Sequence, residues 1–368
     1  MSFSGLLEKY PKEYISGYLN SVNEEQVKTS LNKAEHEIKD FLNLLSPKAD
    51  GFLEQMAVKS QEITVQYFGR VIILYIPLYI SNYCNNSCTY CGFRSENKIP
   101  RSILSLNEVE ENVVEIARKG IKHILLLTGE DRSKTSLGYL LEAVRIVKKY
   151  FSFIGIEMFP MEMEEYARLK EAGVDGLTIY QEVYDREIYK KVHLSGKKTD
   201  YLYRLDTPER GAKANLQSVN IGPLLGLGEP LSETFYAGLH AYYLQKHYPE
   251  VEISLSVPRI NEAEGACGEL FKVDDRTFVR TVTALRIFLK RAGITLSTRE
   301  SPDMRDNLVS LGITRMSAGS QTGVGSYTAQ EKQPEQFSIR DERSIEEITK
   351  MIGSRGYEPI FKDWEMLR

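Results

Sequence analysis

Short apolar runs alternate with amphipathic stretches along most of this 368-residue chain, and this alternation limits the possible folds more than any other feature. Most of the runs are apolar throughout, which is typical of parallel strands buried on both faces. We expect eight strands, at residues 71–81, 123–130, 151–159, 176–183, 218–227, 252–260, 294–300 and 313–320. Three intervening stretches carry apolar residues at helical spacing and end on glycine, a common helix stop: 106–120, 161–173 and 274–293.

Repeated strand–helix units of this kind predict an α/β fold, a (β/α)8 TIM-like barrel. A doubly wound open sheet is the competing arrangement, and it differs in a strand order that the sequence does not reveal. We place the barrel at residues 66–320, between an N-terminal helical extension (1–65) and a C-terminal extension (321–368). Residues 336–360 predict a strand, a helix and a stop. Both extensions are expected to cap the barrel.

Charge and composition exclude several kinds of protein. A net charge of −4 with no basic cluster argues against a surface for nucleic acid or anionic membranes. No apolar stretch approaches the roughly 18 residues of a membrane-spanning helix, and the first residues lack the pattern of a signal peptide. The chain has four cysteines, which fits a reducing compartment. We therefore expect a soluble, cytoplasmic protein.

Three of the cysteines, Cys84, Cys88 and Cys91, form a CxxxCxxC motif, and Cys267 lies far from them in the sequence. Structural zinc takes four protein ligands, so three thiolates without a nearby histidine are a poor zinc site. They suit a four-iron, four-sulfur cluster in which one iron stays open to a small molecule. A disulfide plus one spare thiol is the alternative, although so tight a group is unexpected in a chain with few cysteines.

An aromatic residue, Tyr90, precedes the last cysteine of the motif, and a Gly-Phe pair that ends in Phe93 follows it. In these features the motif resembles that of the radical S-adenosylmethionine (SAM) enzymes. The resemblance implies that the three cysteines bind one 4Fe-4S cluster and that the amino and carboxylate groups of SAM chelate its open iron. An electron passed into SAM then releases a 5′-deoxyadenosyl radical. Tyr90 and Phe93 would lie beside these cofactors.

Polar residues at the ends of two expected strands are candidates for holding SAM, because active sites of such barrels lie at the carboxyl ends of the strands. The resemblance implies that Gly129 and Glu130 hold the methionyl amino group, with Glu130 accepting its hydrogen bonds. Glu182 would suit the ribose hydroxyls, and Arg204 could pair with the carboxylate of SAM. A helix N-cap turn at residues 129–130 and a surface ion pair at Arg204 are the structural alternatives.

Arginines and serines near the ends of the late strands are candidates for binding the substrate: Arg259, Ser297, Arg299, Ser317 and Ser320. An arginine held at a barrel mouth needs an anionic partner, and a substrate carboxylate would be one. Arg299 is the first candidate for this role. Arg259 has an equal alternative, a structural ion pair with Glu300. His193 is expected to be a satisfied loop residue rather than a catalyst.

Longer segments resemble the radical SAM lyases of aromatic amino acids: 78–93, 179–205, 220–230, 254–260, 296–301 and 315–327. The resemblance implies a tyrosine lyase of thiazole formation in thiamine biosynthesis, which splits the Cα–Cβ bond of L-tyrosine into 2-iminoacetate (dehydroglycine) and p-cresol. It further implies thiazole synthase as a protein partner and a flavodoxin or ferredoxin as electron donor. One departure is the pair Glu229-Pro230, where an Asp-Trp-like pair is expected.

Three other assignments are considered, and the count of cluster ligands excludes the first of them. A maturase of iron-only hydrogenase shares this barrel but holds a second cluster on three further cysteines. Because no cysteine follows Cys267 in this sequence, we expect a single cluster. A lyase that acts on another aromatic amino acid, such as tryptophan, would give an indole product. A non-enzymatic iron–sulfur carrier would not cleave SAM.

Overall fold

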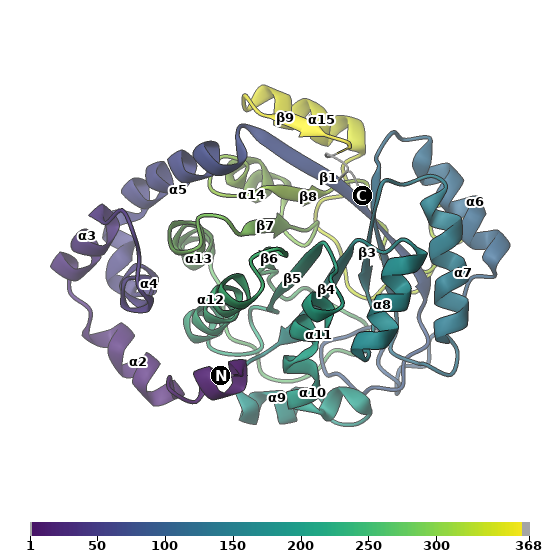
Figure 1. Ribbon diagram of the computed structural model, residues 1–368, viewed down its shortest axis with the longest axis horizontal. Coiled ribbons are helices and arrows are strands. Elements are labelled where there is room, and N and C mark those ends of the chain that lie inside the picture. Colours follow the sequence, from purple (N-terminus) through teal and green to yellow (C-terminus); the bar gives the residue numbers. More distant parts are fainter. Residues whose placement is uncertain (1, 363–368) are drawn as a thin grey trace.

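The structure, a computed structural model, describes residues 2–362 and contains a closed barrel of eight parallel strands (Figure 1). The strands are β1 Val71–Ser81, β2 His123–Thr128, β3 Phe153–Glu157, β4 Gly176–Glu182, β5 Ser218–Pro223, β6 Glu252–Ser256, β7 Gly293–Leu296 and β8 Arg315–Ser317. Neighbours in the sequence pair from β2 to β8, and β1 closes the barrel by pairing with both β8 and β2. The predicted barrel is therefore confirmed, and the open sheet is excluded.

The side chains of β1 show why these apolar runs become barrel strands. Every second side chain is fully buried in the hydrophobic core: Ile72, Leu74, Ile76, Leu78 and Ile80. Three residues between them line a cavity inside the barrel: Tyr75, Pro77 and Tyr79. Successive side chains of a strand point to opposite faces, so the first set faces the surrounding helices and the second set faces the interior of the barrel.

A ring of helices covers the outside of the barrel (Figure 1). It comprises α6 Leu106–Ala117, α7 Leu137–Lys148, α8 Met163–Ala172, α11 Thr207–Lys213, α12 Pro230–His247, α13 Asp275–Phe288 and α14 Pro302–Leu308. Short helices between β4 and α11 lie at the carboxyl ends of the strands instead: α9 Arg186–Val192, η2 Lys197–Thr199 and α10 Tyr201–Leu205. At the start of α6, the Ser105 hydroxyl accepts a hydrogen bond from the Glu108 N–H, and the Glu108 side chain bonds back to Ser105. The three predicted helices form as α6, α8 and α13, but α13 ends at Phe288, and Gly293, the expected helix stop, is the first residue of β7.

The N-terminal helices pack against the side of this ring. They are α1 Phe3–Leu7, α2 Lys12–Ser21, α3 Glu24–Asn32, α4 Ile38–Leu45 and α5 Leu53–Phe68, with a 3-10 helix η1 at Pro47–Phe52. Phe41 of α4 stacks on Phe288 of α13 and on Phe235 of α12, with ring centroids 4.5 Å and 6.0 Å away. In Figure 1 these helices form an outer arc beside α12 and α13. The expectation that they cap the barrel is therefore wrong, because their apolar side chains pack on the outer face of the ring.

The C-terminal extension does reach the barrel mouth, where Gln336 and Phe337 line the central cavity. The strand predicted to open residues 336–360 does not form there. Instead, the Gln336 carbonyl accepts a hydrogen bond of 2.9 Å from the N–H of Gly92, in the loop of residues 82–97 that we call the cysteine loop. The segment bonds to this loop rather than to a neighbouring strand.

The rest of the extension adds a helix and a short outer strand. α15 Ile345–Ser354 matches the predicted helix, and β9 Glu358–Ile360 follows it where a stop was expected. β9 pairs in parallel with the first three residues of β1. The divisions at residues 65 and 320 stay predictions, and residues 1 and 363–368 lie outside the described chain. Between residues 2 and 362, no helix has the length and apolar character needed to cross a bilayer.

Candidate active site

The cysteine loop leaves β1 at the carboxyl end of the barrel, and three distant segments hold it through backbone hydrogen bonds. The Thr89 N–H donates to the Val192 carbonyl at 3.0 Å. The Thr89 carbonyl accepts from the Cys267 N–H at 2.7 Å, and Gly92 donates to Gln336 as described above. The shape of the loop therefore depends on residues from the middle and the end of the chain.

The three motif cysteines are free thiols, and Cys88 is buried. Burial, together with the nearby Cys84, raises the pKa of Cys91 to about 11, so thiolates here need a cationic partner such as a metal centre. In the described part of the chain, no three His, Cys, Asp or Glu side chains group as ligands of one metal ion. A cubic cluster does not require such a group, because each thiolate binds a different iron atom. The three thiols therefore fit an iron–sulfur cluster.

Four charged side chains gather beside this loop, and we call Glu130, Glu182, Lys198 and Arg204 the charge cluster. Arg204 Nη1 lies 2.9 Å from Glu130 Oε1, and Lys198 Nζ lies 2.7 Å from Glu182 Oε1. The two cross pairs are longer, at 3.9 Å between Lys198 and Glu130 and 3.8 Å between Arg204 and Glu182. Asn86 Nδ2 donates to Glu130 Oε2 at 2.8 Å, which joins the charge cluster to the cysteine loop.

The charge cluster is buried and carries two charges of each sign. Burial opposes the ionised form of Glu130, but the charges of Arg204 and Lys198 hold its pKa below the usual value. Arg204 is only 5% exposed, so the surface ion pair considered for it is wrong. The two cations of the charge cluster can donate hydrogen bonds and the two carboxylates can accept them. The charge cluster therefore suits a zwitterion such as the amino-acid end of SAM. Lys198 was missed from the sequence, where nothing distinguishes it from the exposed Lys197.

Backbone geometry fixes two of the predicted SAM residues. A Cβ at Gly129 would lie 2.3 Å from the carbonyl oxygen of Tyr83, so only glycine lets the end of β2 approach the cysteine loop this closely. Glu182 has φ +71°, at an irregularity in the pairing of β4 with β5. Such a conformation costs a non-glycine residue of order 1–3 kcal/mol and is concentrated at functional sites.

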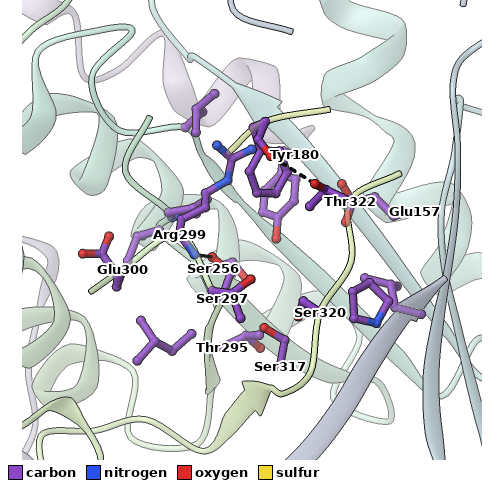
Figure 2. A pocket seen from close by; sticks show the side chains of 18 of the residues that line it. Glu157, Tyr180, Ser256, Thr295, Ser297, Arg299, Glu300, Ser317, Ser320 and Thr322 are labelled. Carbon is purple, nitrogen blue, oxygen red and sulfur yellow. Dashed lines mark hydrogen bonds between the residues drawn. The ribbon is translucent and has the colours of Figure 1, made fainter. Parts of the chain in front are cut away.

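A cavity of about 1030 Å³ lies inside the barrel, toward the carboxyl ends of the strands. Part of this volume is open solvent at the mouth. Tyr90 and Cys91 form part of its wall, and Glu182 brings the charge cluster to it. Four predicted substrate residues line it as well: Ser297, Arg299, Ser317 and Ser320. Figure 2 shows Arg299 above these three serines, on the same side of the space. The structure therefore brings the predicted cofactor and substrate residues to one cavity.

Arg299 provides a positive charge in this cavity. Its guanidinium carbon lies 3.2 Å from the centroid of the Phe337 ring, and burial lowers the pKa of the side chain. Within residues 2–362, no carboxylate lies within ion-pair distance of it. A stacked, desolvated and unpaired guanidinium is a site for an anion.

Arg259, in contrast, is already paired. Its guanidinium forms a forked ion pair with Glu300, where Nε lies 3.0 Å from both carboxylate oxygens, and a second pair with Asp275 at 2.7 Å. It does not belong to the cavity wall. The structure supports the structural alternative for Arg259, and it leaves the predicted substrate contact without support.

The aromatic residues around the motif differ in their surroundings. The Tyr90 hydroxyl donates to His193 Nε2 at 2.8 Å, and His193 Nδ1 donates to the Tyr189 carbonyl at 3.0 Å. Burial and the charges of Lys198 and Arg204 hold the pKa of His193 well below its usual value, so it is a neutral, satisfied loop residue. Phe93 is buried edge-on against Tyr79 and does not line the cavity.

Sequence reasoning missed several residues that line the cavity: Tyr79, Glu157, Tyr180, Thr322 and Gln336. Glu157 is the last residue of β3, but the predicted strand ran on to residue 159, so the sequence did not mark Glu157 as a strand end. The tyrosines lie inside predicted strands, where their aromatic side chains look like ordinary core residues.

Two family descriptions match this chain. The radical SAM superfamily covers residues 78–235, and the biotin and thiamin synthesis associated domain covers residues 256–358. The 2-iminoacetate synthase of Escherichia coli (strain K12) is 36% identical over 348 residues, which are 94% of this chain and 92% of that protein. The same enzyme from Salmonella typhimurium matches to the same extent, also at 36% identity.

Solved structures agree with this result. HydG, a maturase of the FeFe-hydrogenase, superposes with a TM-score of 0.89 at 30% identity, covering 95% of this chain and 80% of that chain. Methylornithine synthase (PylB), at a TM-score of 0.72 and 21% identity over 91% of this chain and 97% of that one, supports the fold alone. Such enzymes use an iron–sulfur cluster and SAM, and the cysteines and charge cluster fit both. The chain therefore belongs to the radical SAM aromatic amino acid lyases, the family of 2-iminoacetate synthase, and is a radical SAM lyase.

Proposed function

We propose that this enzyme cleaves the Cα–Cβ bond of L-tyrosine to give 2-iminoacetate and p-cresol, in thiazole formation for thiamine biosynthesis. The observation that carries the proposal is Arg299, a partly buried guanidinium that pairs with no carboxylate of the described chain and that shares a cavity with Cys91. The match to 2-iminoacetate synthase over 94% of the chain supports the choice of product.

Three motif cysteines and the charge cluster would hold the cofactors. Cys84, Cys88 and Cys91 would bind one 4Fe-4S cluster, and the cluster and SAM, when bound, supply the 5′-deoxyadenosyl radical. Glu130 would accept hydrogen bonds from the methionyl ammonium, Arg204 and Lys198 would face the methionyl carboxylate, and Glu182 would accept from the ribose hydroxyls. A single cluster is proposed because Cys267 is the one cysteine left in the sequence, too few to ligate a second.

Binding and orienting the substrate are the main tasks of the cavity. The Arg299 guanidinium can hold the tyrosine carboxylate through two parallel hydrogen bonds. The Ser320 hydroxyl, 4% exposed and without a partner in the described chain, can donate to the same group, and Ser297 and Ser317 lie on the same wall. An anchored carboxylate keeps Cα and its amino group close to Arg299, while the phenol lies farther from it. The barrel wall shields the reacting atoms from water on every side except the mouth.

Two protein partners belong to this proposal. The imine carbon of 2-iminoacetate is open to attack by water, so direct transfer to thiazole synthase would protect the product. The proposed cluster must be reduced before SAM can be cleaved, and a donor of the flavodoxin or ferredoxin type would supply that electron.

An anaerobic assay tests the function. Reduced, reconstituted enzyme is incubated with SAM and one aromatic amino acid at a time, and p-cresol, indole products and 5′-deoxyadenosine are measured. We expect p-cresol and 5′-deoxyadenosine from tyrosine, with about four irons per chain. Indole products formed from tryptophan, without p-cresol from tyrosine, would replace the substrate. Absence of 5′-deoxyadenosine with every amino acid would support a carrier instead, and about eight irons would contradict the single cluster.

A further inference from the structure

Glu157 is an acidic side chain in the cavity that the proposed reaction has not yet used. It ends β3, and Figure 2 shows its carboxylate pointing into the cavity beside Thr322. No described residue forms a hydrogen bond or an ion pair with this carboxylate. Interior carboxylates are seldom left without a partner, because the charged form loses its hydration.

Burial and the surrounding charges determine the pKa of Glu157. Burial and the nearby Glu182 raise its pKa to about 7, while Arg299, Lys198 and Arg204 act in the opposite direction. Lys198 and Arg204 already have carboxylate partners in the charge cluster. Three tyrosines inside the barrel are close enough for Glu157 to influence their pKa values: Tyr75 and Tyr79 on β1 and Tyr180 on the neighbouring strand β4.

Glu157 and Arg299 are therefore two opposite charges that line one cavity without pairing with each other. Each is close enough to influence the pKa of the other, yet no ion pair joins them. A ligand that carries both a carboxylate and an ammonium group would satisfy both at once, and an α-amino acid is such a ligand. With its carboxylate on Arg299, such a ligand could present its ammonium group to Glu157, which lines the same cavity.

We propose that Glu157 binds the α-ammonium group of the amino-acid substrate and accepts one proton from it. This inference rests on the proposed function. The proton moves from nitrogen to a carboxylate oxygen of Glu157, the electron pair of the broken N–H bond stays on nitrogen, and the products are a neutral amine and a carboxylic acid. Removing a hydrogen atom from a neutral amine leaves a neutral nitrogen radical, whereas removing it from an ammonium group leaves a charged and less stable one. Glu157 thus prepares the amino group for hydrogen-atom loss.

A comparison of two ligands on the wild type and two variants tests this role. L-Tyrosine and 3-(4-hydroxyphenyl)propanoate, which lacks the amino group, are titrated anaerobically into the cluster-loaded enzyme with SAM. We expect Glu157→Gln to weaken tyrosine binding by roughly 10- to 100-fold and to leave the binding of the analogue unchanged. Glu111→Gln, at an exposed position on α6, changes the net charge equally and should bind both ligands as the wild type does.

The pH dependence of p-cresol formation provides a second measurement. For the wild type, kcat/KM should rise with pH and level off above about pH 7, as Glu157 loses its proton. The pH profile of Glu157→Gln should lack this rise. Glu157→Asp keeps a carboxylate and should retain part of the tyrosine affinity and part of the pH dependence. It provides the test if Glu157→Gln does not take up its cluster.

Two results would overturn the inference. Equal weakening of both ligands would mean that Glu157 supports the cavity rather than the amino group. A change confined to the preference for tyrosine over phenylalanine would place Glu157 at the phenol. A wild-type enzyme that neither binds nor cleaves tyrosine would instead overturn the proposed function, and this outcome is visible without any variant.

Discussion

Replacing Arg299 with methionine is expected to remove the carboxylate site while leaving the fold as stable as that of the wild type. The substitution loses the stacking on Phe337, worth about 1–2 kcal/mol for a desolvated cation. It also removes an unpaired charge from a partly buried position, which restores a similar amount. With an unfolding entropy of about 2.1 cal/mol/K per residue, a net change of about 1 kcal/mol shifts the Tm of the 368-residue chain by only about 1 °C.

Arg299 is partly buried and unpaired, so the control is Arg305 on α14, which is fully buried and ion-paired. Its guanidinium forms an ion pair with Asp341, both side chains being 0% exposed, and donates to the Ser317 carbonyl. Removing one member of a buried pair costs about 3–5 kcal/mol. Arg343 stays 2.7 Å from Asp341, so we expect the lower end of this range. At about 2.1 cal/mol/K per residue, Arg305→Met should lower Tm by about 4 °C.

Thermal unfolding and tyrosine binding are measured on both variants. Arg299→Met should bind tyrosine at least about 30-fold more weakly, since the loss of one side of a buried charge pair commonly costs about 2–5 kcal/mol. If Arg299→Met lowers Tm as much as Arg305→Met does, the protein itself satisfies the Arg299 charge and the anion-site argument fails. Normal tyrosine binding by Arg299→Met would show that the carboxylate is held elsewhere.

Three further predictions concern the cluster, the close approach at β2 and the pH dependence of stability. Cys88→Ala should abolish the visible absorption of the cluster and all SAM cleavage, whereas Cys267→Ser should keep both; loss of the cluster in the serine variant would contradict the assignment of ligands. Gly129→Ala should also lose SAM cleavage, because its Cβ would meet the Tyr83 carbonyl at 2.3 Å, and an unchanged rate of 5′-deoxyadenosine formation would refute this reasoning. The pKa of Glu157 is raised from 4.5 to about 7 in the fold, so the stability that its protonated form contributes is present below pH 4.5 and lost as the pH rises through 7. Glu157→Gln should therefore raise the free energy of unfolding relative to the wild type by up to about 3 kcal/mol above pH 7, with little difference near pH 5; equal stability of the two proteins at about pH 9 would contradict the shift.

Most of the barrel could be predicted because each strand is a separate apolar run. The strand β9 could not, since its three residues, Glu358–Ile360, include a charge and a proline and form a strand only because the edge of β1 is free beside Val71. Residues 336–337 show the opposite error, since a strand was predicted there and does not form. They begin a segment with an apolar pattern, but their side chains fill the barrel mouth.

The location of a site residue could be predicted where it follows from the end of a strand. The role of a residue could not be predicted where it depends on which side chains form ion pairs. Strand ends placed Glu130, Glu182 and Arg299 correctly around one opening. Arg259 and Arg299 carry the same signature in the sequence, and they differ only in that Glu300 turns toward the former. That difference is a property of side-chain packing and does not appear in any motif.

The way the cysteine loop is held has a consequence for the order of events in the cell. Its partners Val192, Cys267 and Gln336 are made long after the motif itself has left the ribosome. A nascent chain that carries all three thiols therefore still lacks the framework that arranges them. Iron–sulfur loading is expected to follow completion of the polypeptide, so a prematurely terminated product would acquire no iron.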